Sequence, residues 1–98
     1  MFRDPLVQKA WDLRPQTDLF PIAVILEAMA WLELKYQQAP DRELAIAIAL
    51  QYLVLAMRRE LRASPGVAKE YFSRAVRWRE EACRLKKREA FLIYQNQN

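Results

Sequence analysis

Two stretches of the chain, residues 19–34 and 44–57, are too apolar to form ordinary surface helices. In the second stretch, Gln51 is the only residue outside the hydrophobic class. A helix that is hydrophobic nearly all round must be buried nearly all round, and a chain of 98 residues offers few other elements to cover two such helices. The sequence therefore predicts helices that are covered partly by one another and partly by a second copy or by another protein.

The scarcity of glycine favours helices over sheets. Gly66 is the only glycine in the chain, so the residue that β-hairpins and tight strand turns most need is nearly absent. Ninety-eight residues are enough for one small domain with one core. We therefore expect a single all-α domain over residues 1–98.

Helix-starting signals divide this domain into four helices. Asp4 and Ser64 each precede a proline, a pattern typical of an N-cap followed by the first helical residue, and Asp41 can cap a third helix. Proline disfavours the helical conformation of the residue before it, so Pro15 should end the first helix. The expected elements are a short helix over residues 5–14 and long helices over residues 19–38, 41–63 and 65–94, with residues 95–98 frayed.

Short connections should make consecutive helices antiparallel neighbours, so we expect a small up-down bundle of the three long helices preceded by the short one. The helix over residues 41–63 should be central, because a wheel of about 100° per residue gives it two opposite apolar faces. One face gathers Leu44, Ile48, Tyr52 and Leu55. The other gathers Ile46, Leu50, Leu53 and Met57.

The helix over residues 19–38 is harder to bury. One broad apolar face suits the core, but Phe20, Val24 and Trp31 form a second apolar stripe nearly opposite. Either the short first helix folds over this stripe or a second copy of the chain covers it, and we favour the second copy. Trp31 should be its strongest anchor, because aromatic residues dominate binding hot spots. The interface residues expected are Phe20, Val24, Trp31, Ile46, Leu50, Leu53 and Met57.

The net charge of +4 comes from the end of the chain. Residues 1–65 carry eight basic and eight acidic side chains, whereas residues 66–98 carry eight basic and four acidic ones. A basic helix face can bind the phosphates of nucleic acids or another polyanion. The alternative is a solvated face with internal pairs, such as Glu70–Arg74, at the spacing that supports a helix. The residues expected to bind a polyanion are Arg74, Arg77, Arg84, Lys87 and Arg88.

Several kinds of chemistry have no support in the sequence. The chain has no histidine and no glycine-rich loop, and its only cysteine is Cys83. We therefore expect no catalytic residue, no metal site, no cofactor and no small-molecule substrate. An unpaired cysteine usually packs as a small buried hydrophobe, and its isolation suits the reducing cytoplasm. Both apolar stretches are too short or too interrupted to predict a membrane span.

Two hypotheses about function remain. The first is a non-enzymatic helical protein–protein interaction module with a regulatory, scaffolding or assembly role, which acts as a homodimer and binds another protein. The second is a small basic protein that binds nucleic acid or another polyanion through its last helix.

Overall fold

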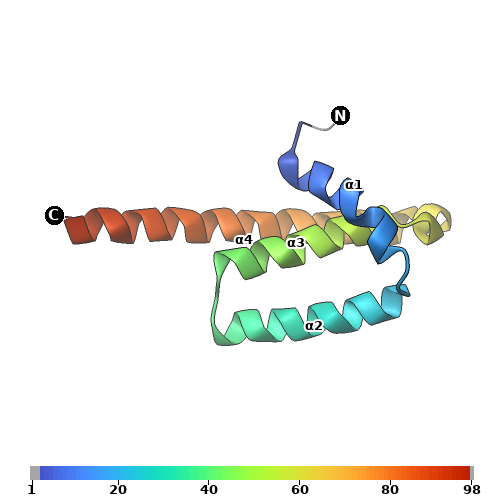
Figure 1. Ribbon diagram of the computed structural model, residues 1–98, viewed down its shortest axis with the longest axis horizontal. Coiled ribbons are helices and arrows are strands. Elements are labelled where there is room, and N and C mark those ends of the chain that lie inside the picture. Colours follow the sequence, from blue (N-terminus) through green and yellow to red (C-terminus); the bar gives the residue numbers. More distant parts are fainter. Residues whose placement is uncertain (1–2, 98) are drawn as a thin grey trace.

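The computed structural model describes residues 3–97, and it is all-α as expected (Figure 1). Its elements are α1 (Pro5–Thr17), α2 (Ile22–Gln38), α3 (Arg42–Ala56), the short 3-10 helix η1 (Arg59–Ala63) and α4 (Pro65–Gln97). Figure 1 shows α3 running back along α2 and α4 running back along α3, with α1 crossing obliquely on the side away from α2. Of the three long helices, α4 is much the longest.

The central element is α3, which packs against α1, α2 and α4, and its contact with α4 is the most extensive in the fold. Ala45 and Ala49 are fully buried, as are the larger side chains of Ile48 and Leu55. α4 contributes Ala75 to the same core as Ile48 and Leu55. This arrangement confirms α3 as a two-faced central helix.

The expected end of α1 at residue 14 is wrong, because Pro15 lies inside the helix. Its missing N–H removes one helical hydrogen bond, but the last turn is closed by other donors. The Asp18 N–H donates to the Arg14 carbonyl oxygen at 2.9 Å, and the Thr17 hydroxyl donates to the same oxygen at 3.0 Å. A proline this close to a C-terminus therefore does not end the helix.

The expected boundaries of α2 and α3 also need correction. α2 begins at Ile22, because Pro21 is extended and serves as its N-cap, which leaves residues 19 and 20 in the connector. α3 ends at Ala56 instead of residue 63, and Arg58 is extended before η1 begins. The cause is tertiary: the buried guanidinium of Arg58 binds carbonyl oxygens of the α1–α2 connector, and the backbone leaves the helical path to place it there.

α4 begins at Pro65, as expected, and continues to Gln97, three residues beyond the expected end. Helical conformation thus extends into the segment for which we expected fraying, while Asn98 lies outside the described residues. Leu85 is the last buried residue among the described side chains. Figure 1 shows the following turns projecting past the ends of α2 and α3. We call residues 86–97 the arm.

Candidate interaction surface

The outer side of α2 and the connector before it carry a row of large apolar side chains that the chain does not cover. We call this row the outer stripe; it consists of Leu19, Phe20, Val24, Trp31 and Leu34, which are between 48% and 80% exposed. On the opposite side of α2, Ile25 and Met29 are buried in the core. The Lys35 ammonium lies 4.2 Å from the centroid of the Trp31 ring, so a cation covers part of the largest member of the stripe.

The short first helix does not cover this stripe. α1 packs on α3, where Ala10 is fully buried in the same core as Leu50 and Leu53. The first helix therefore covers α3 and not the outer side of α2, which was the alternative that we considered. Phe20, Val24 and Trp31 stay exposed as a consequence.

The α3 residues expected in the interface are mostly inside the chain. Leu50 and Leu53 are buried and Met57 is half-buried, so these three are corrected from interface to core. Ile46 alone of this face is exposed, at 37%. It lines a shallow groove with Leu6 of α1 and Cys83 of α4, on a different side of the molecule from α2. The structure therefore separates Ile46 from the outer stripe.

Cys83 is exposed, contrary to our expectation of burial. Its neighbour Ala82 is buried, and so is Leu85. Successive helical residues differ by about 100° in direction, so the helix turn that buries Ala82 points Cys83 away from the core. The groove beside Cys83 is bordered by an ion pair between Arg79 and Asp4.

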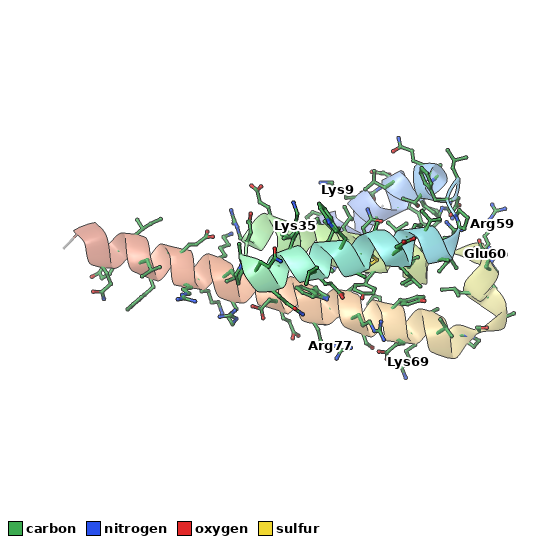
Figure 2. The ribbon with its side chains drawn as sticks, turned by 90° about the horizontal axis from the view of Figure 1, so that it is seen from below. Lys9, Lys35, Arg59, Glu60, Lys69 and Arg77 are labelled. Carbon is green, nitrogen blue, oxygen red and sulfur yellow. The ribbon has the colours of Figure 1, made fainter. Side chains whose placement is uncertain are left out.

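The first three polyanion-binding candidates are paired with carboxylates on their own helix. Arg74 Nε donates to Glu70 Oε1 at 3.0 Å, and Arg77 Nη2 lies 3.6 Å from the same oxygen. Arg84 Nε donates to Glu81 Oε1 at 3.0 Å. Figure 2 shows Arg77 projecting from α4 away from the helical body. These pairs lower the positive potential of the middle of α4.

Lys87 and Arg88, the last two candidates, are exposed on the arm. They follow Lys86, which is exposed too, and precede Glu89, which lies 3.9 Å from Arg42 of α3. Three adjacent cations thus stand at the point where α4 leaves the helical body.

The contact between α2 and α4 is made by aromatic and polar side chains that sequence reasoning did not pair. The Tyr36 hydroxyl donates to Glu81 Oε1 at 2.7 Å, and its ring meets the Trp78 ring edge-on with centroids 4.9 Å apart. Close by, the Tyr52 hydroxyl donates to Glu33 at 2.8 Å. Burial, and then the adjacent carboxylate, raises the pKa of each tyrosine. These hydroxyls therefore act as hydrogen-bond donors that attach α2 to α3 and α4.

The arm carries the second group of large exposed apolar residues. Phe91, Leu92, Ile93 and Tyr94 are each between 51% and 63% exposed. Four consecutive helical residues point to all sides of the helix, so no single neighbouring surface of the same chain buries them.

Within residues 3–97, no three acidic or cysteine side chains come together as a metal site. No helix of this described part has both the length and the hydropathy needed to cross a membrane. Comparisons of the chain with protein-family models, with curated proteins and with solved structures find no match.

Proposed function

We propose that the protein is a non-enzymatic helical interaction module that acts as a homodimer through the outer stripe and serves a regulatory, scaffolding or assembly role toward another protein. The observation that carries this proposal is the exposure of five large apolar side chains along α2 and the connector before it, while the other side of α2 is already buried. Contiguous apolar surface of this kind is typical of protein interaction sites. The single free cysteine is consistent with a cytoplasmic location.

Trp31 is the expected centre of the interface. Full burial of a large apolar side chain contributes about 1.5–3 kcal/mol, from which the entropic cost of association is subtracted. Trp31 is 56% exposed, so about half of this contribution is still available for binding. Glu27, exposed on the same side of α2, supplies a polar rim.

Sedimentation analysis of the wild-type protein and of Trp31→Ala tests the proposal. We expect the wild type to dimerise at micromolar concentration and Trp31→Ala to need at least tenfold more protein, because a symmetric dimer loses the exposed half of two Trp31 side chains, together about 1.5–3 kcal/mol. Phe72→Ala is a matched control, because Phe72 is 50% exposed, close to the 56% of Trp31, but lies on α4 outside the outer stripe. A wild type that stays monomeric at high micromolar concentration would refute the homodimer.

A second candidate function is polyanion binding through the arm. The favouring observation is the row of exposed cations Lys86, Lys87 and Arg88, followed by the exposed rings of Phe91 and Tyr94, which can stack on bases. Binding of mixed-sequence DNA or RNA should then weaken steeply as salt increases, and Lys87→Glu with Arg88→Glu should abolish it. No binding at low salt would eliminate this candidate.

A further inference from the structure

We propose that, in the homodimer, the arm of each copy packs on the outer stripe of the other. This inference rests on the proposed function and specifies which surface of the second copy occupies the stripe. Among the described large apolar side chains, those more than 50% exposed all belong to the outer stripe or to residues 91–94 of the arm. An exchange of this kind covers the stripe and the side of the arm that faces it with one contact.

The arm does not reach the stripe of its own chain. α4 is one continuous helix from Pro65 to Gln97, and Figure 1 shows it carrying the arm past the ends of α2 and α3. The outer stripe lies on the side of α2 opposite the buried Ile25 and Met29. Contact between arm and stripe therefore requires a second copy.

The charges of the two surfaces favour this pairing over its alternatives. The arm has three cations and one carboxylate, Lys86, Lys87, Arg88 and Glu89, and is net positive. Beside the stripe, Glu27 is exposed and Lys35 lies over the Trp31 ring, so their charges cancel. Glu33 is half-buried on the other side of α2 and accepts a hydrogen bond from the Tyr52 hydroxyl. Arm against arm would bring like charges together, and α2 against α2 would leave the apolar residues of both arms exposed. Arm against stripe avoids both and places the arm cations near Glu27.

The area available is that of a stable dimer. Large aromatic side chains offer roughly 150–250 Å² each, and the residues concerned are about half exposed or more. With about half of the arm residues facing the stripe, two arms on two stripes would bury on the order of 1,200–1,500 Å², within the range of a standard specific interface. When the copy that receives an arm returns its own arm to the same partner, the contact closes on itself with two-fold symmetry and does not continue into a filament.

Disulfide trapping tests the arrangement directly. In a Cys83→Ser background, one protein carries Gln95→Cys on the arm and a second carries Ala28→Cys beside the outer stripe; both original side chains are exposed, so the apolar residues stay intact. We expect the mixture to give mainly the 28–95 disulfide under mild oxidation. Lys69→Cys, at the other end of α4 (Figure 2), is the matched control and should not cross-link to residue 95.

Reversing one charge on the arm and one beside the stripe provides a second test. Lys87→Glu should weaken dimerisation about two- to fivefold, as expected for an exposed ion pair, and Glu27→Lys in the same chain should restore it. Phe91→Ser with Ile93→Ser should weaken it at least tenfold. If the wild type is dimeric but the cysteine variants give mainly the 28–28 disulfide, and the arm variants dimerise normally, the arm exchange is wrong while the proposed homodimer stands. If the wild type is monomeric, both are wrong.

Discussion

Arg58 and Phe20, which are 38 positions apart in the sequence, are joined by a hydrogen bond of 2.9 Å from the Arg58 guanidinium to the Phe20 carbonyl oxygen. The same nitrogen donates to the Thr17 carbonyl oxygen at 2.8 Å, and the Arg58 side chain is almost entirely buried. Arg58 therefore fixes the connector that carries the first residues of the outer stripe to the C-terminal end of α3.

Replacing Arg58 should destabilise the fold. We expect Arg58→Met to lower the free energy of unfolding by about 2–4 kcal/mol, because two carbonyl oxygens near the core lose a charged donor. Urea denaturation measures the change. The adjacent Arg59 is exposed (Figure 2), so Arg59→Met should stay within about 0.5 kcal/mol of the wild type. Equal effects of the two substitutions would show that Arg58 has no special structural role.

The isoleucines of α3 provide a test of the assigned core. Ile48 is fully buried, whereas Ile46, two residues earlier, is 37% exposed. Ile48→Ala should cost about 2–5 kcal/mol of unfolding free energy, because it removes buried methyl groups and leaves a cavity. Ile46→Ala should cost clearly less in the same urea denaturation experiment. A larger loss for Ile46 would mean that α3 is rotated relative to the arrangement described.

Gly66 offers a stabilising substitution. It lies in the first turn of α4 with a negative φ angle, and a Cβ atom added there would meet no other atom within 4 Å. Gly66→Ala should raise the free energy of unfolding by about 0.5–1 kcal/mol, because alanine restricts the unfolded chain more than glycine does. Thermal unfolding followed by circular dichroism would register a higher midpoint, and a lower one would contradict the assigned helix start.

Protonation of Glu81 makes the stability of the fold depend on pH. Hydrogen bonds from Arg84 and then from Tyr36 lower the pKa of Glu81 below its ordinary value of 4.5. Because the folded state holds this proton less tightly, the stabilisation is present above pH 4.5 and is lost as pH falls through the folded-state pKa. Tyr36→Phe should move the pKa of Glu81 upward in an NMR titration of its carboxyl carbon. Tyr94→Phe, on the arm, should leave it unchanged, and a shift of similar size there would disprove the assigned contact.

The starts of three helices could be predicted from the sequence because their signals are local. The Asp4 carboxylate accepts from the Leu6 N–H, the Asp41 carboxylate accepts from the Glu43 N–H, and Pro65 opens α4. The end of α3 could not be predicted in this way. It depends on the hydrogen bonds of Arg58 to a distant connector, and no proline or glycine marks the break.

Part of the candidate interaction surface could also be predicted, because helical periodicity is a local signal in the sequence. Helical periodicity places Phe20, Val24 and Trp31 opposite the core face of the helix expected over residues 19–38, and all three are exposed, although Phe20 precedes α2. Periodicity also identifies two apolar faces on α3, but it does not say which neighbour covers each, so Leu50 and Leu53 were misassigned. That information depends on where α1 packs, which is a property of the whole fold.

The continuity of α4 has a consequence for the speed and strength of association. Because the arm extends a helix whose earlier turns are held in the core, its conformation is fixed before any encounter, and little conformational entropy remains to be lost on binding. The partner surface therefore binds a helix that is already formed and not a segment that must fold on contact. Association should therefore follow simple second-order kinetics, without a folding step that limits the rate.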